Sequence, residues 1–146
     1  MSLLLAILVT AATHLPKANT RAEVQRYVEE AAKLVQRHGP ACVLLASPAW
    51  RSNDYYIFVD GPNDNILCHA NAAMIGKAPS TFVNSKGEKV GVMITAKAHG
   101  NGKGWVDYFW LPPGKKTEEL KSSYVMGITG PDGKHYIVGA GGFNLK

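Results

Sequence analysis

The feature that most constrains the fold of this chain is the aromatic segment from Gly104 to Pro113. It holds two of the three tryptophans, together with a tyrosine and a phenylalanine, within the six positions from Trp105 to Trp110. Aromatic residues favour β-strands, and the proline pair that follows must end the strand because proline cannot donate a ladder hydrogen bond. The segment therefore predicts one short strand whose rings either fill the core or form the wall of a small-molecule pocket.

Helices and further strands are expected on both sides of this segment. Thr20 and Glu23 form a capping-box pattern, and the apolar residues after them recur at helical spacing until His38-Gly39-Pro40, which predicts a long amphipathic helix. The run from Cys42 to Ala46 predicts a brief second helix or a buried connector, and the ring of Trp50 looks exposed. The remaining expected elements are a hairpin (55–60 and 65–69), a long connection (70–85), a helix (88–98) and two strands (121–129 and 135–140).

Two strands followed by three, with helices before and between them, indicate an α+β fold. We expect an antiparallel sheet of about five strands, with a long N-terminal helix and a helix between strands two and three. A length of 146 residues fits one domain. Tight turns make the aromatic strand a neighbour of the strand that begins at Lys121, and that strand a neighbour of the last one.

Alternation along a strand places Val106, Tyr108 and Trp110 on one face of the aromatic segment and Trp105, Asp107 and Phe109 on the other, where the two rings belong to the core. On the neighbouring strand, Lys121 shares a face with Ser123 and Val125. If Tyr108 and Trp110 face the same way as Lys121, two rings with polar groups and one ammonium meet, as expected of a pocket for a small polar ligand. Otherwise the rings are plain core and Lys121 lies at a solvated edge.

No catalytic, metal-binding or cofactor-binding pattern can be recognised. Cys68 and His69 are neighbours on a strand and point to opposite faces, and the five histidines have no ligand spacing. The net charge is +5, but the lysines are scattered and Lys115-Lys116 is the one adjacent basic pair, which argues against a nucleic-acid partner. We therefore expect no enzyme activity, no metal and no cofactor.

The apolar run from Leu3 to Val9, followed by small residues, has the size and order of a signal peptide, although no basic residue precedes it. We expect residues 1–18 to be a signal peptide or hydrophobic leader and residues 19–146 to be the domain. Because a bilayer requires roughly 20 apolar residues, no stable membrane span is expected. Cys42 and Cys68 are expected to be buried free thiols, unless an oxidising compartment allows a single bridge.

From about Thr20 to its end, the chain resembles a single Cache domain of the second type. The motifs that carry the resemblance are Tyr56-Ile57-Phe58-Val59-Asp60, Leu67-Cys68-His69-Ala70, Ile75-Gly76-Lys77, Gly104-Trp105-Val106-Asp107-Tyr108-Phe109-Trp110, Lys121-Ser122-Ser123-Tyr124-Val125 and Val138-Gly139-Ala140-Gly141. The resemblance implies an extracytoplasmic, PAS-like sensor that binds a small molecule such as a short carboxylate, an amine or urea, for signal transduction of the chemotaxis type. Two segments near the expected pocket mouth depart from the family pattern, Asn84-Ser85-Lys86-Gly87 and Leu111-Pro112-Pro113.

Carried over residue by residue, the resemblance implies a ligand-binding site made of Tyr108, Trp110, Lys121 and Tyr124, with His69 at its rim. Lys121 would form a charge-assisted hydrogen bond to a small polar metabolite such as a carboxylate. The expected form is a stand-alone soluble domain in the periplasm or secreted, whose further partner is a second copy of the chain or a membrane receptor. The alternative is a structural or protein-interaction module on the same fold, which a pocketless structure around Trp110 would favour.

Overall fold

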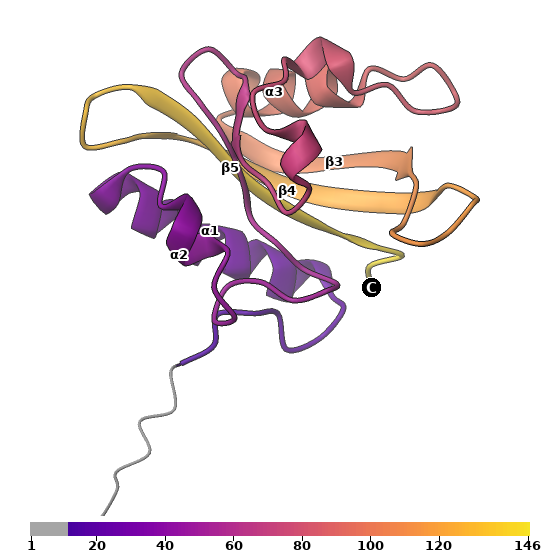
Figure 1. Ribbon diagram of the computed structural model, residues 1–146, viewed down its shortest axis with the longest axis horizontal. Coiled ribbons are helices and arrows are strands. Elements are labelled where there is room, and N and C mark those ends of the chain that lie inside the picture. The colour runs from indigo at the N-terminus through magenta and orange to yellow at the C-terminus, as the bar shows by residue number, and fades with distance from the viewer. Residues whose placement is uncertain (1–11) are drawn as a thin grey trace, which may run out of the picture.

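A computed structural model describes residues 12–146, so the apolar run at 3–9 lies outside the described residues. The elements are α1 (Arg21–His38), α2 (Cys42–Leu45), β1 (Phe58–Asp60), β2 (Ile66–Cys68), the short 3-10 helices η1 (Ala72–Met74) and η2 (Pro79–Thr81), α3 (Val90–Gly100), β3 (Lys103–Trp110), β4 (Glu119–Thr129) and β5 (His135–Phe143). Within this part of the chain, five antiparallel strands form one sheet in the order β2-β1-β5-β4-β3. Helices α1 and α2 cover one face of the sheet and α3 lies over the other (Figure 1). This architecture confirms the expected α+β fold.

Helix α1 begins as the sequence predicts, but its capping box is only half formed. The Thr20 hydroxyl accepts a hydrogen bond from the Glu23 amide at 3.2 Å. The Glu23 carboxylate accepts instead from the Lys17 amide, at 2.8 Å, so it holds the chain that precedes the helix. The buried residues of α1 are the apolar ones at helical spacing, and they pack on β4 and β5.

Strands β3, β4 and β5 form the expected meander, and β5 lies at the centre of the sheet between β4 and β1. The first two strands, Phe58–Asp60 and Ile66–Cys68, are shorter than expected, and the hairpin register shifts between Val59 and Asp60. The last two are longer, since β4 begins at Glu119 and β5 continues to Phe143.

Alternation along the central strands separates two apolar layers. Val138 and Ala140 of β5, with Tyr124 and Ile128 of β4, pack against α1. The layer on the other face includes Ile137 and Val125, and it packs against α3. Trp105 belongs to the α1 layer as predicted. Phe109 was expected in the core but is half-buried, with the Lys86 ammonium 3.7 Å from its ring centre.

The expectation of an exposed Trp50 is wrong. Its ring is 4% exposed and stacks on His14 at a centroid distance of 4.0 Å, and its carbonyl accepts a hydrogen bond from the Tyr27 hydroxyl. A ring of this size is buried by contacts with distant segments, which local polarity does not report. His14 lies within the stretch 1–18, whose assignment as a leader stays a prediction.

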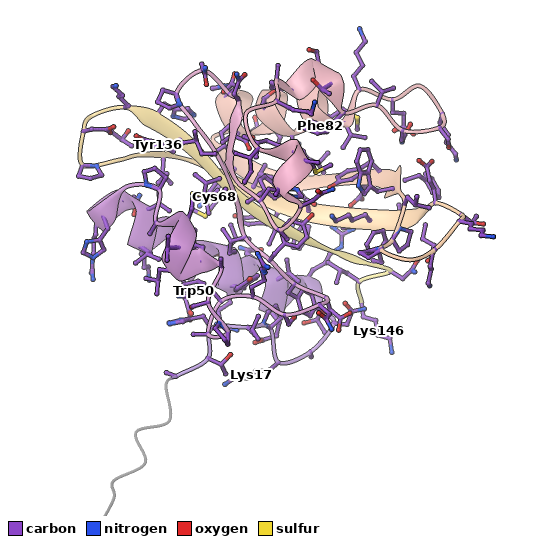
Figure 2. All side chains as sticks on the ribbon, viewed as in Figure 1. Lys17, Trp50, Cys68, Phe82, Tyr136 and Lys146 are labelled. Atoms are coloured by element: carbon purple, nitrogen blue, oxygen red, sulfur yellow. A yellow bond between two sulfur atoms is a disulfide. The ribbon has the colours of Figure 1, made fainter. Side chains whose placement is uncertain are left out.

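The cysteines are bridged, so the expectation of free thiols is also wrong. A disulfide joins Cys42 of α2 to Cys68 of β2, across a sequence separation of 26. The disulfide ties the short helix to the edge strand, and Figure 2 labels Cys68 on that strand. The run from Cys42 forms the brief helix, one of the two expected forms. It is not buried as a whole, since Val43 is 90% exposed.

Helix α3 begins two residues later than predicted and ends at Gly100. Gly91 weakens the helix in isolation, but its missing side chain has a packing role: a Cβ there would overlap the Pro79 carbonyl. The glycine therefore lets η2 lie directly against α3.

Candidate ligand-binding site

A cavity of about 60 Å³ lies on the α3 face of the sheet. Its lining comes from β1, β2, β3 and β4, from the segment that carries η1 and η2, and from α3. Phe82, on this face beside α3 (Figure 2), is one of the apolar side chains around it, with Phe58, Met74 and Ile94. A buried water needs about 10–15 Å³, so the cavity holds on the order of four to six water-sized groups.

Glycines on β5 allow neighbouring side chains to lie directly on the central strand at the cavity face. Gly139 and Gly141 are directly opposite Val125 and Ser123 of β4, so they belong to the cavity face. A Cβ on Gly139 would overlap the Phe58 ring, and one on Gly141 would overlap the Ser123 hydroxyl. The central strand therefore presents bare backbone where the side chains of its neighbours converge.

Lys121 and Tyr108 are paired across β4 and β3, which places both side chains on the cavity face. Lys121 is 7% exposed, and its Nζ lies 3.5 Å from the Tyr56 hydroxyl and 5.4 Å from the ring centres of Tyr56 and Phe143. The Tyr108 hydroxyl lies 2.7 Å from Ser123 Oγ. The ammonium is therefore surrounded by phenol groups and ring faces.

Within residues 12–146, no ion pair joins Lys121 to a carboxylate. Burial lowers the pKa of the Lys121 ammonium, but Tyr108 and Tyr56 raise it by more, so the pKa lies above its ordinary value. Lys121 is consequently charged at neutral pH. A buried charge without a counter-ion is uncommon in proteins, because desolvation of the charge is then uncompensated.

His69 follows β2 and contributes a neutral imidazole to the same cavity. Burial first, and the Lys121 charge second, lower the pKa of His69 to about 4. Its Nδ1 accepts a hydrogen bond from the Asn71 amide at 2.9 Å, so the ring proton must reside on Nε2. The imidazole therefore has one N–H donor that this loop leaves free, and its ring lies 4.8 Å from that of Tyr56.

A larger hollow of about 960 Å³ adjoins the cavity and shares its boundary at Tyr56, His69, Met74, Trp110 and Lys121. One of its walls is the segment from Leu111 to Lys115, so this departure from the family pattern does lie at the mouth.

The other segment that departs from the family pattern, residues 84–87, is part of the loop before α3 and lines neither hollow. The Asn84 side chain donates to the Phe109 carbonyl at 3.0 Å, and its Oδ1 accepts from the amides of Lys86 and Glu88. Asn84 therefore fastens the loop that precedes α3 to strand β3.

Four of the five residues predicted for the site line this cavity: Tyr108, Trp110, Lys121 and His69. Tyr124 does not. It lies on the opposite face of β4, in the α1 layer, with its ring 5.3 Å from that of Trp105. The physical reason is alternation, because Tyr124 is an odd number of positions from Lys121 and must point away from it.

Sequence reasoning missed Tyr56, which approaches Lys121 closely from the segment before β1. It also missed Phe58 and Asp60 in the cavity lining. A period of two through 56, 58 and 60 was present in the sequence, and it could have placed these three side chains on one face.

An antiparallel sheet of five strands, with a long helix on one face and a helix-covered cavity on the other, defines the class of PAS-like α+β sensor domains. The chain belongs to the Single Cache domain 2 family, whose model matches residues 5–141. That match begins inside the stretch that the sequence assigns to a leader.

Two solved structures are similar to this chain. The periplasmic sensor domain of a chemotaxis protein is 25% identical with a TM-score of 0.53, and the alignment covers 62% of this chain and 61% of that one. A Cache chemosensory domain studied for carboxylic acid recognition is 24% identical with a TM-score of 0.54, covering 81% of this chain and 71% of that one. This chain thus spans less than two thirds of the first of these relatives. A search of curated proteins finds no match.

None of the helices within residues 12–146 combines the length and the apolar character that a membrane-spanning helix requires.

Proposed function

We propose that this chain is an extracytoplasmic sensor domain that binds a small carboxylate and catalyses no reaction, with no cofactor. The observation that carries the proposal is the Lys121 ammonium, which is buried at the boundary of a cavity and pairs with no carboxylate of residues 12–146. An anionic ligand would compensate the desolvated charge and form the short, charge-assisted hydrogen bonds that such pairs make.

The neighbours of Lys121 suit a carboxylate. The Tyr56 hydroxyl and the His69 Nε2–H are donors on the same boundary, and Trp110 and Met74 supply apolar walls. In the Tyr108–Ser123 pair one hydroxyl donates to the other, so one proton of the pair stays free to donate. Several donors, apolar walls and a small volume favour a ligand of few heavy atoms with one anionic end.

The similar structures also support carboxylate binding by an extracytoplasmic domain. Carboxylic acid recognition is described for one similar Cache chemosensory domain. The other similar structure is a periplasmic sensor domain, and the Cys42–Cys68 disulfide is typical of an oxidising compartment. We infer a periplasmic or secreted domain that passes the binding event to a second copy of the chain or to a membrane receptor.

Calorimetric titration with formate, acetate, propionate and butyrate tests this proposal, with the matching primary amides as uncharged controls. We expect at least one carboxylate to bind and to raise the melting temperature, because a ligand that binds only the folded state stabilises it. Lys121→Met should lower that affinity at least tenfold. Lys134→Met removes an exposed lysine in the turn before β5 and is the matched control.

Binding that is equal for carboxylates and amides, or undiminished in Lys121→Met, would show that the anchor is wrong. If no carboxylate or amide binds, a structural or protein-interaction role on this fold becomes the better explanation. NMR spectra of a bound carboxylate should be unchanged after long incubation with the protein, whereas turnover would contradict the proposal of binding without catalysis.

A further inference from the structure

The end of the cavity away from Lys121 contains a second unpaired group. Asp60, the last residue of β1, lines the cavity and is 5% exposed. Its Oδ1 is buried and has no hydrogen-bond partner among residues 12–146. Buried carboxyl oxygens are normally satisfied, so an orphan that borders a cavity indicates a donor that comes from outside the chain.

Lys121 is too distant to be that donor. On β5, Asp60 is opposite Ile137 and Lys121 is opposite Phe143, six residues further along the same strand. At about 3.3 Å per residue this is about 20 Å along the strand between the two backbones. The Lys121 side chain extends back over Gly141, where its Cε lies 3.1 Å from the position of an added Cβ, so its ammonium is closer to Asp60 than the backbones are. One carboxyl and one ammonium therefore mark different ends of one lining, with apolar side chains such as Phe58 between them.

The groups around Asp60 leave it without a cation. Its nearest charged neighbour in sequence is Asp64, in the turn after β1, whose Oδ1 is already paired with His99 Nε2 of α3 at 2.8 Å. Burial first, and the Asp64 charge second, raise the pKa of Asp60 to about 7. The other titratable groups of the lining are His69, Tyr56, Tyr108 and Lys121, and none of them is a carboxylic acid.

We propose that Asp60 forms a subsite for a cationic nitrogen of the ligand, a primary ammonium or an amidinium, so that the cavity accepts a molecule with a carboxylate at one end and a cation at the other. This inference rests on the proposed function, because Lys121 has to hold the carboxylate end. An organic cation fits better than a metal ion, since no group of three or more metal-ligating side chains is found within residues 12–146.

The test is a chain-length series measured by calorimetry. Unbranched carboxylates of three to six carbons are compared with the ω-amino carboxylates of equal length, from β-alanine to 6-aminohexanoate, and with butylamine. We expect at least one amino carboxylate to bind ten times more tightly than the carboxylate of its own length. Asp60→Asn should reduce this ratio to about one, and the same titrations in Lys121→Met measure the carboxylate end separately.

A second measurement follows the proton that binding releases. A bound cation requires Asp60 to be ionised, so binding of an amino carboxylate at pH 6.5 should release protons, seen as a binding enthalpy that depends on the ionisation enthalpy of the buffer. Affinity for the same ligand should increase about tenfold from pH 6 to pH 8, and Asp60→Asn should remove both effects.

The outcomes separate the two proposals. If carboxylates bind through Lys121 but the amino group adds nothing at any length and no proton is released, the Asp60 subsite is wrong and the proposed function stands. If butylamine binds in an Asp60-dependent manner while carboxylates do not bind, the subsite stands and the carboxylate anchor is wrong. An amino-group gain that persists in Asp60→Asn also overturns the subsite.

Discussion

Gly141 of β5 and Ser123 of β4 are directly opposed, and a Cβ on Gly141 would overlap the Ser123 hydroxyl that lies beside Tyr108. We expect Gly141→Ala to displace Ser123 and to lower the free energy of unfolding by about 1–3 kcal/mol, the usual cost of overpacking. Gly142→Ala is the control, because its new Cβ would meet the flexible end of the Leu145 side chain. Urea denaturation measures the free energy of unfolding of both variants. Equal losses of that free energy would contradict the role given to Gly141.

Tyr56 and Tyr124 lie on opposite faces of the sheet, so their substitution should affect ligand binding differently. Tyr56→Phe removes a hydroxyl that adjoins Lys121, so it should weaken carboxylate binding several-fold. Tyr124→Phe changes a ring on the α1 side and should leave the affinity within twofold of wild type. Calorimetric titrations compare the two variants, and a ligand-affinity loss confined to Tyr124→Phe would refute the location of the cavity.

Two buried groups predict opposite dependences of stability on pH. His69 has a folded pKa of about 4, so between about pH 4 and pH 6.5 the unfolded chain binds the extra proton and stability rises with pH. Asp60 has a folded pKa of about 7, so between about pH 4 and pH 7 the folded chain binds the extra proton and stability falls with pH. Each contributes at most about 1.4 kcal/mol per pH unit.

The two contributions should largely cancel in the wild type, and single variants should reveal them. Relative to wild type, Asp60→Asn should become more stable as pH rises from 4 to 6.5, while His69→Gln should become less stable. Urea denaturation at several pH values measures the differences. Parallel pH profiles for all three proteins would show that neither group titrates as described.

The disulfide predicts a large loss of stability on removal. Replacing both Cys42 and Cys68 by alanine opens a loop across a sequence separation of 26. The chain-entropy model then gives a loss of about 3.5 kcal/mol. Denaturation midpoints of the double variant and of the wild type, with and without a reducing agent, test this, since the reducing agent should affect only the wild type.

The hydrogen bonds of Asn84 predict the effect of placing an acidic residue at this position, in the segment before α3 that departs from the family pattern. Asn84→Asp keeps an acceptor for the amides of Lys86 and Glu88 but replaces the donor to the Phe109 carbonyl by an oxygen. We expect a loss of about 1–3 kcal/mol, the cost of an unsatisfied buried group. Asn53→Asp, in an exposed loop, is the control, and equal stabilities would show that the link to β3 is unimportant.

The elements with strong local signals could be predicted from the sequence. The cap at Thr20, the helix after it and the meander that starts at the aromatic strand all follow from spacing, capping and tight turns. The pairing of β1 with β5 could not be predicted, because no turn joins them and register depends on contacts between distant residues. The burial of Trp50 depends in the same way on His14 and Tyr27.

The site could be predicted only in part. Once Tyr108 is paired with Lys121, alternation assigns every residue of β3 and β4 to a face, and it places Tyr124 on the face opposite to Lys121. The approach of Tyr56 and the orphan state of Asp60 depend on the three-dimensional packing of the short strands, which sequence patterns do not encode.

The glycines of β5 also determine how little material separates the cavity face of the sheet from the α1 layer. At Gly139 and Gly141 no side chain fills the cavity side of the central strand, while the intervening Ala140 touches the α1 layer directly behind it. The Phe58 ring and the Ser123 hydroxyl lie directly on these two positions, so a single layer of peptide backbone separates them from the α1 layer. A shift of Phe58 or Ser123 would therefore press on the β5 backbone itself, and Ala140 holds that backbone against the α1 layer.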